Sequence, residues 1–148
     1  MGYYYKELKA LYHQYEEIIS YLIVGGLTTL VSLVSKYALL FTILDAADAV
    51  QLQISVIISW ILAVAFAYWA NRTFVFKSKD PKILGEIARF VAARVATLLM
   101  EALILWFFIT LLEMNSDFHV VLWTVVTQIL ILIGNYVFSK IVVFRKPK

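Results

Sequence analysis

Two charged residues, Arg94 and Glu101, lie inside an otherwise apolar stretch of the sequence, residues 90–112. With Phe90 and Thr97 they recur at spacings of four, three and four residues, which places all four side chains on one face of a helix. A guanidinium donates several hydrogen bonds to an anion such as a phosphate, whereas a carboxylate accepts hydrogen bonds from hydroxyl groups. The pattern therefore predicts a polar binding face on this helix.

Polar residues recur at helical spacing on two other stretches. One stripe consists of Gly25, Thr28, Ser32 and Lys36, and a weaker one consists of Thr124, Thr127 or Gln128, Ile131 and Asn135. Charges inside a bilayer are costly, so they normally face the interior of a helix bundle or a wet cavity. At about 1.5 Å per residue, Lys36 and Glu101 lie roughly 22 Å and 16 Å beyond the aromatic residue that opens each helix. The two charges can therefore meet.

Each of these charges also has a simpler interpretation. The long side chains of Arg94 and Lys36 can extend to the headgroups at the two sides of a membrane without any binding role. Glu101 is too short to do so. It either forms a structural ion pair with Lys36 or Arg94, or it belongs to a transport path, and the sequence leaves both interpretations open.

Polar residues at the ends of two apolar stretches leave a similar choice. Asn71 and Asn135 either form hydrogen bonds at helix ends or contact a ligand. Arg72 and Lys140 either set the membrane topology or bind a lipid headgroup.

The composition indicates where these residues must lie. Of the 148 residues, 63% are hydrophobic and 16% are charged, against about 45–50% and 25% in soluble domains. A mean hydropathy of +0.85 leaves too little polar surface for a soluble enzyme. A membrane-crossing helix needs about 20 apolar residues, and the sequence provides four such stretches, at about 18–44, 49–71, 90–112 and 118–139. We predict an all-α membrane protein, with four transmembrane helices in a single domain over residues 1–148.

The residue types argue against several kinds of chemistry. The chain has no cysteine and only two histidines, which lie far apart in the sequence, so we expect neither thiol chemistry nor a metal site. No nucleophile–base pair, phosphate-binding glycine loop or pair of carboxylates can be assembled from the other residues. We therefore expect no catalytic residue and no cofactor, and the protein is not expected to be an enzyme.

The basic residues predict the orientation in the membrane. Eleven of the thirteen lysines and arginines fall in the N-terminal segment, the middle loop and the C-terminal segment, whereas residues 45–48 and 113–117 contain acids and no basic residue. Because basic segments remain in the cytoplasm, both termini should face it. This rule also accounts for the net charge of +3 without a nucleic acid partner. Tyrosines, leucines and charges at helical spacing in residues 1–17 predict an amphipathic interfacial helix.

The two halves of the chain match each other. The ends of the second and fourth stretches align at an offset of 68 residues, where Tyr68, Arg72 and Val75-Phe76 coincide with Tyr136, Lys140 and Val143-Phe144. The openings of the first and third stretches align at an offset of 69, which pairs Tyr21 with Phe90 and Thr28 with Thr97. This self-similarity predicts two parallel helical hairpins, residues 18–79 and 87–148, each ending in a short amphipathic hook at the cytoplasmic face.

Four ordered motifs also give the chain a family resemblance. They are Tyr21–Thr29, Asn71–Phe76, Arg89-Phe90 followed by Arg94, Thr97 and Glu101, and finally Asn135-Tyr136 with Ser139-Lys140 and Val143-Phe144. With these motifs the chain resembles the GtrA-like family of small four-helix bacterial membrane proteins over about residues 17–145. Ser32 departs from the family pattern, because many relatives have Asn at that position.

The resemblance implies a function and a set of site residues. It implies translocation of polyprenyl-phosphate-linked sugars across the bacterial cytoplasmic membrane, beside a membrane-associated glycosyltransferase, for glycosylation of cell-surface polysaccharide or teichoic acid. We then expect the lipid phosphate to be bound by Arg72, Arg94 and Lys140. The expected polar path for the sugar consists of Thr28, Ser32, Asn71, Thr97, Glu101 and Asn135, with Lys36 as a buried charge partner. A homo-oligomer is compatible with the small interior of a four-helix unit.

Two other functions remain as alternatives. One is a scaffold that recruits or stabilises a glycosyltransferase and moves no lipid. The other is a small multidrug exporter, a class that also has four helices and one membrane-embedded Glu. Exporters of that class resemble one another in having this Glu in the first helix and little charge bias, whereas here Glu101 is in the third helix and the bias is strong.

Overall fold

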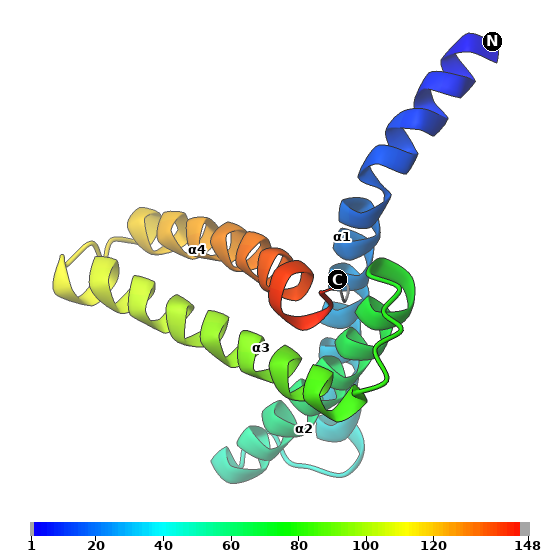
Figure 1. Cartoon of the computed structure of the whole chain (residues 1–148). Helices are drawn as coiled ribbons and strands as arrows, with labels where there is room; N and C mark the ends of the chain where they lie inside the picture. Colours follow the sequence, from blue (N-terminus) through cyan, green and yellow to red (C-terminus); the bar gives the residue numbers. More distant parts are fainter. Residues whose placement is uncertain (1, 146–148) are drawn as a thin grey trace. The chain divides into compact units, whose positions relative to one another are not determined.

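Four long helices make up most of the protein. The computed structural model describes residues 2–145, with the backbone alone at Tyr3, and that range contains no strand. The helices are α1 (Gly2–Thr42), α2 (Ala49–Ala70), α3 (Ile83–Leu105) and α4 (Asp117–Phe138) (Figure 1). Each is long and apolar enough to cross a membrane, which confirms the predicted all-α fold with four candidate spans. Lys146 and Lys148, which the predicted orientation included, lie outside the described residues, as does the side chain of Tyr3.

Two helices begin earlier than their apolar stretches do. Helix α1 starts at Gly2 and runs without a break into the first span, so the segment expected at the membrane interface is part of the same helix. Helix α3 starts at Ile83 rather than near residue 90. It follows Pro81, and Asp80 Oδ1 accepts a hydrogen bond from the backbone N–H of Lys82 at 2.9 Å. The predicted start near residue 90 marked the beginning of the apolar stretch, whereas the helix itself begins at the turn formed by Asp80 and Pro81.

The chain divides into two compact units. The first ends at Lys77 and the second begins at Ser78. The first contains α1, α2 and the π-helix η1 (Asn71–Val75), and the second contains α3, the π-helix η2 (Trp106–Leu111), α4 and the π-helix η3 (Ser139–Val143). Each unit is therefore a helical hairpin followed by one π-helical turn.

Small residues bring the two helices of the first hairpin together. The buried side chains of α2 are those of Ser55, Ser59, Ala63, Ala67 and Ala70, and small side chains allow membrane helices to approach closely. Helix α2 begins at the N-cap Asp48, whose carboxylate accepts hydrogen bonds from backbone N–H groups of the first turn. Those bonds, from Gln51 and then Val50, hold the pKa of Asp48 below its ordinary value.

The two hairpins close in the same manner. Each ends in a backbone bond of π-helical spacing, from Phe76 N–H to Asn71 O at 2.9 Å and from Phe144 N–H to Ser139 O at 2.8 Å. The Phe76 ring then contacts Tyr21, with ring centroids 6.5 Å apart. The Phe144 ring contacts Phe90, at 6.0 Å. The residues that align in the sequence thus make the same contact in their own units.

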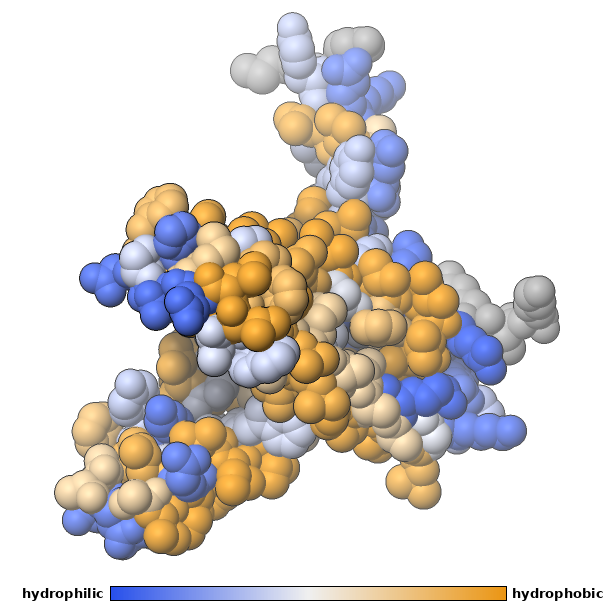
Figure 2. Space-filling model, turned by 90° about the vertical axis from the view of Figure 1, so that its left-hand side faces the viewer, coloured by the Kyte–Doolittle hydropathy of each residue, from blue (hydrophilic) through white to orange (hydrophobic). Residues whose placement is uncertain are grey.

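The surface of the protein is largely apolar. Hydrophobic residues cover most of the face seen in Figure 2, with hydrophilic residues gathered in separate patches. Large side chains such as Phe41 and Leu84 are 83% exposed. Exposure of this extent is unfavourable in water but suits hydrocarbon, as a membrane protein requires.

Candidate functional site

A buried hydroxyl–amide pair links the two long helices of the second unit. Thr97 Oγ1 on α3 lies 2.9 Å from Asn135 Oδ1 on α4. The exposed fractions of the two residues are 2% and 8%. Gly134 precedes Asn135, and a methyl group at Gly134 would lie 3.7 Å from Thr97 Cγ2 and from Met100 Cε. The helices are therefore close enough at this level for two predicted site residues to meet.

Arg94 lies one turn before Thr97 on α3 and packs on an aromatic ring. Its guanidinium carbon is 4.8 Å from the centroid of Phe90, a ring that is only 1% exposed. Among the described residues of the second unit, no hydrogen bond or ion pair engages Arg94. A cation held by a ring face keeps its N–H donors available, so this guanidinium can receive an anion.

Glu101 is held by a neutral amide. Gln128 Nε2 on α4 donates a hydrogen bond to Glu101 Oε1 on α3 at 2.8 Å. The sequence left open an ion pair with Lys36 or Arg94 or a place in a transport path, and it offered Gln128 only as an alternative in the stripe on α4. Arg94 contacts Phe90 instead. Lys36 belongs to the first unit, where its Nζ lies 5.8 Å from the centroid of Tyr37, and its pairing with Glu101 stays a prediction.

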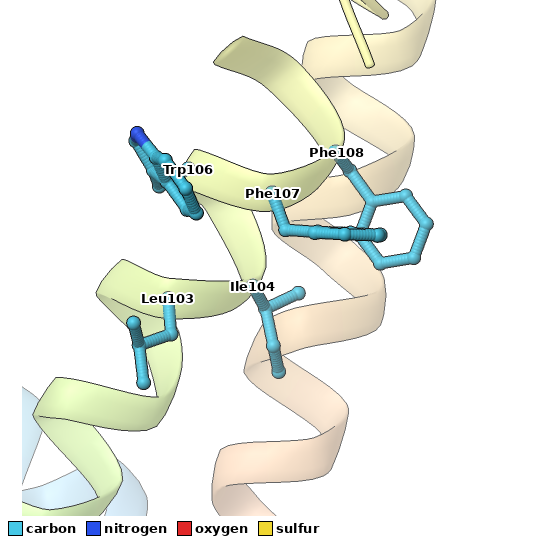
Figure 3. Close-up of a pocket in the computed structure, with 5 residues that line it drawn as sticks. All are labelled: Leu103, Ile104, Trp106, Phe107 and Phe108. Carbon is cyan, nitrogen blue, oxygen red and sulfur yellow. The ribbon is translucent and has the colours of Figure 1, made fainter. Parts of the chain in front are cut away.

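An apolar pocket lies further along α3, where the helix changes to η2. It has a volume of about 290 Å³ and is lined by Leu103, Ile104, Trp106, Phe107 and Phe108. Figure 3 shows Trp106 pointing away from the two phenylalanines. The Phe108 ring stacks on Trp123 of α4, with centroids 3.5 Å apart. The lining carries no charged group, and its one polar side-chain atom is the indole nitrogen of Trp106, so the pocket differs in chemistry from the polar contacts of α3.

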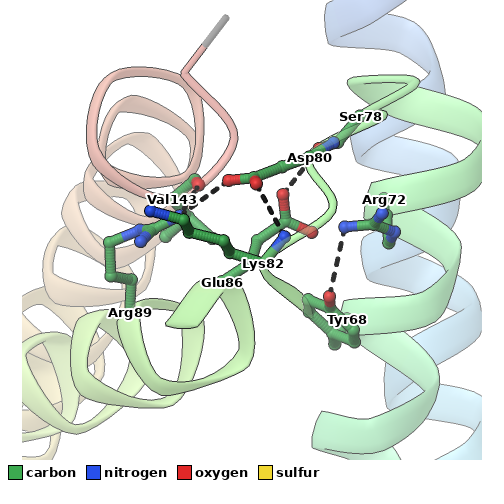
Figure 4. Close-up of polar contacts among 8 residues, drawn as sticks. All are labelled: Tyr68, Arg72, Ser78, Asp80, Lys82, Glu86, Arg89 and Val143. Carbon is green, nitrogen blue, oxygen red and sulfur yellow. Dashed lines mark hydrogen bonds and ion pairs between the residues drawn. The ribbon is translucent and has the colours of Figure 1, made fainter. Parts of the chain in front are cut away.

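The two predicted phosphate ligands in the hooks each lie beside a tyrosine. In the first unit, Arg72 Nη1 is 3.5 Å from Tyr68 Oη (Figure 4). In the second unit, Lys140 Nζ is 3.3 Å from Tyr136 Oη and 5.6 Å from the centroid of the same ring. Both cations occupy π-helical turns, a geometry that is frequent at functional sites.

The polar residues of the first unit have contacts within their own helices. Asn71 is 1% exposed, and its Nδ2 donates to Ala67 O at 2.7 Å. Its Oδ1 is buried and lacks a hydrogen-bond partner among the described residues. Thr28 Oγ1 donates to Val24 O at 2.8 Å. Ser32 is half-buried on α1, as is Lys36. Thr97 and Asn135 thus meet within the second unit, whereas the hydrogen bonds of Asn71 and Thr28 stay within the helices of the first unit.

Comparison with known proteins decides the family. The transmembrane domain named GtrA/DPMS matches residues 20–144, which include every residue of the candidate site. The chain belongs to the GtrA/DPMS transmembrane domain family. This membership confirms the predicted resemblance. No solved structure matches the chain.

Among the relatives of this GtrA/DPMS chain are proteins named for a glycosylation process. The cell wall teichoic acid glycosylation protein GtcA of Listeria monocytogenes serovar 1/2a is 32% identical over 88% of this chain and 86% of its own length. The protein of the same name from Listeria innocua is 33% identical over the same shares. A Bacillus subtilis relative, the uncharacterized membrane protein YwcD, is 30% identical over 86% of this chain and 96% of its own length. The chain is therefore a multi-pass membrane protein with bacterial homologues.

Sequence reasoning missed a polar cluster at the start of α3 in this GtrA/DPMS chain (Figure 4). Glu86 is fully buried and accepts a hydrogen bond from Ser78 Oγ at 2.6 Å. Arg89 Nη2 lies 3.4 Å from Asp80 Oδ2 and donates to Val143 O at 3.3 Å. The cluster thereby ties the segment before α3, and the end of η3, to the first turns of α3. One feature of the sequence could have indicated this cluster, namely that Glu86 is an acid in the first turn of a helix. Nothing in the sequence indicated that Glu86 is buried.

Proposed function

We propose that this protein translocates a polyprenyl-phosphate-linked sugar from the cytoplasmic to the outer leaflet of the bacterial cytoplasmic membrane. The sugar would then serve glycosylation of a cell-surface polysaccharide or teichoic acid. The observation that carries the proposal is the order of polar groups on α3. Arg94, with no anionic partner among the described residues of its unit, is followed by Thr97 with Asn135 and then by Glu101 with Gln128.

The start of this path suits a phosphate. The planar guanidinium of Arg94 is able to form two parallel hydrogen bonds to phosphate oxygens. Arg72 and Lys140, at the hooks of their own units, would attract the headgroup from the cytoplasmic side. Their positions beside Tyr68 and Tyr136 limit the directions in which the two long side chains extend.

The continuation of the path suits sugar hydroxyls. Arg94 and Glu101 are seven residues apart, which is about 10 Å along a helix and comparable to the length of a sugar with its phosphate. Bare hydroxyl groups are costly to place in hydrocarbon unless they find hydrogen-bond partners. Thr97, Asn135 and Glu101 would supply such partners from the second hairpin. Within the first hairpin, the groups able to contact sugar hydroxyls are Thr28, Ser32 and Asn71, whose buried Oδ1 has no hydrogen-bond partner among the described residues.

The proposed function is combined with the membrane arrangement that the basic residues and the repeat predict. The two hairpins are parallel repeats, both hooks lie at the cytoplasmic face, and both termini face the cytoplasm. The polyprenyl tail remains in the lipid between helices. The protein acts without catalysis beside a glycosyltransferase that makes the lipid-linked sugar, and the relatives named for teichoic acid glycosylation support this setting.

Reconstitution tests the proposal directly. The purified protein is placed in liposomes that carry a labelled polyprenyl-phosphate sugar on one leaflet, and exposure of the label on the other leaflet is followed over time. Exposure should be faster than in empty liposomes and should fall with Arg94→Ala. If the wild-type protein moves no lipid, alone or with its glycosyltransferase, the carrier function is wrong and the scaffold function replaces it.

A further inference from the structure

Helix α1 carries an uncovered row of apolar side chains that begins well before the first membrane span. The row consists of Leu8, Leu11, Tyr15, Ile18 and Leu22, which we call the α1 seam. Leu8 is 67% exposed and Tyr15 is 46% exposed. Figure 1 shows the first turns of α1 extending beyond α2 and η1. The hairpin itself therefore leaves this part of the helix uncovered.

The seam has the spacing of a coiled coil. Its members follow one another at three, four, three and four residues, which is the a and d pattern of a heptad repeat. With Leu8, Tyr15 and Leu22 at a, the positions that point away from a partner helix are b, c and f. These positions carry Lys6, Lys9, His13, Glu16 and Glu17. Only one charge of the segment, that of Glu7, flanks the seam.

The seam is distinct from the face of α1 that packs inside the hairpin. Tyr21 and Val24, on that face, are 4% and 5% exposed, and Tyr21 contacts Phe76 of the same unit. Glu16, which forms an ion pair of 3.2 Å with Lys77, is at an outward heptad position. The hairpin contacts of α1 therefore leave the seam available.

Two features argue against a position flat on the membrane surface. A helix that turns onto the surface usually breaks at the membrane border, but the sequence has no Gly or Pro between Gly2 and Gly25, and α1 is continuous. Residues 2–17 carry two lysines against three glutamates. Helices that bind anionic leaflets are instead rich in basic residues.

A second copy of this chain fits the seam because the membrane aligns the α1 helices of two copies. Copies inserted with the same topology place their α1 helices parallel and at equal depth, so each seam faces its own equivalent in register. A coiled coil this short is marginal in water, but confinement in a bilayer raises the effective concentration of its two strands. The spacing also continues to Gly25 and Thr29, small residues that allow helices to approach within the membrane.

We propose that the protein forms a parallel dimer through α1, with the seam as the interface. The proposal does not depend on what the protein transports. It predicts that seam residues of two copies lie opposite one another, whereas residues at outward heptad positions point away.

Disulfide cross-linking tests the dimer, because the natural chain has no cysteine. Leu11→Cys and Tyr15→Cys are the seam variants, and Lys9→Cys and His13→Cys, at outward positions of the same turns, are the matched controls. Under mild oxidation in native membranes, the seam variants should shift from the 17.0 kDa monomer to a band of twice that mass. The controls should stay monomeric.

A second substitution gives an independent readout. Leu8→Glu places a charge in the seam, at a side chain that the hairpin leaves exposed, so the fold of the monomer is preserved. Added to Tyr15→Cys, it should abolish most of the cross-linked dimer. Three outcomes overturn the proposal: equal cross-linking of seam and control variants, monomeric seam variants, or a cross-linked band that contains a different protein.

Discussion

Thr97 on α3 and Asn135 on α4 form a buried polar contact of 2.9 Å between their side-chain oxygens. Both residues are buried, and Thr97 Oγ1 also lies 3.0 Å from Arg94 O and 3.2 Å from Ala93 O of its own helix, so the contact with Asn135 is the one that reaches the neighbouring helix. A contact of this kind fixes the rotation of each helix as well as the distance between them, because only one face of each carries the polar group.

We predict that Thr97→Val destabilises the second hairpin. Valine has nearly the same shape but no hydroxyl, so the amide of Asn135 loses its partner, at a cost of about 1–3 kcal/mol. Thermal unfolding in detergent measures the loss. Thr124→Val is the matched control, because Thr124 Oγ1 donates to Val120 O on its own helix and the residue is exposed, and it should unfold at the wild-type temperature. Equal stability of both variants would contradict the contact.

The position of Arg94 predicts a loss of function without a loss of folding. Arg94→Ala should keep its yield in membranes, because Arg94 has no ionic partner within residues 78–145, but it should abolish surface glycosylation. Arg94→Lys should restore part of the glycosylation, since lysine keeps the charge and loses the planar two-pronged grip. Lys82→Ala, which removes an exposed cation, is the control. Sugar analysis of the cell wall and blots of membranes give the two readouts.

The variant Glu101→Gln distinguishes a structural ion pair of Glu101 from its neutral hydrogen bond with Gln128. Glu101→Gln keeps a hydrogen-bond acceptor opposite Gln128 Nε2, so its folded yield should equal that of the wild type. Glycosylation should fall, because the charged acceptor for sugar hydroxyls is gone. A large drop in the yield of Glu101→Gln would instead indicate a cationic partner such as Lys36, since an uncompensated buried cation is destabilising.

The hydrogen bond from Ser78 to Glu86 predicts a stability effect away from the proposed path. Ser78→Ala removes a donor at 2.6 Å from a fully buried carboxylate, which should cost about 1–3 kcal/mol. Thermal unfolding gives the value. Lys79→Ala, at the exposed neighbouring position, should change nothing, and comparable losses in both variants would mean that the whole segment, rather than the hydrogen bond, is responsible.

The predicted orientation can be checked with single cysteines in loops. Cysteines at Ala47 and Asn115 should react with a membrane-impermeant maleimide in intact cells, whereas one at Lys79 should react only after the cells are opened. In the middle loop Lys79 is chosen because its neighbour Ser78 is bonded to Glu86 through the side-chain hydroxyl, and a cysteine there would break that bond. All three positions are exposed. Labelling of Lys79→Cys from outside would reverse the orientation and exclude cytoplasmic hooks.

The sequence by itself determined the membrane character, the number of spans and the helix faces that carry polar groups. Each of these depends on local properties, namely the length of an apolar run and the 3.6-residue period of a helix. The offsets of 68 and 69 residues likewise paired Phe76 with Phe144 and Tyr21 with Phe90. In the structure these residues form the same ring contact in each unit, Tyr21–Phe76 and Phe90–Phe144.

Only the tertiary structure decided which polar groups meet. Gln128 rather than a cation holds Glu101 within the second unit, and Glu86 is buried beneath a serine of the preceding segment. Such contacts depend on how far each helix is rotated and how two antiparallel helices are staggered. A shift of one residue turns a side chain by about 100° around the helix axis. The spacing of polar residues along one helix does not change when the neighbouring helix slides along it, so this spacing does not show which residues of the two helices meet.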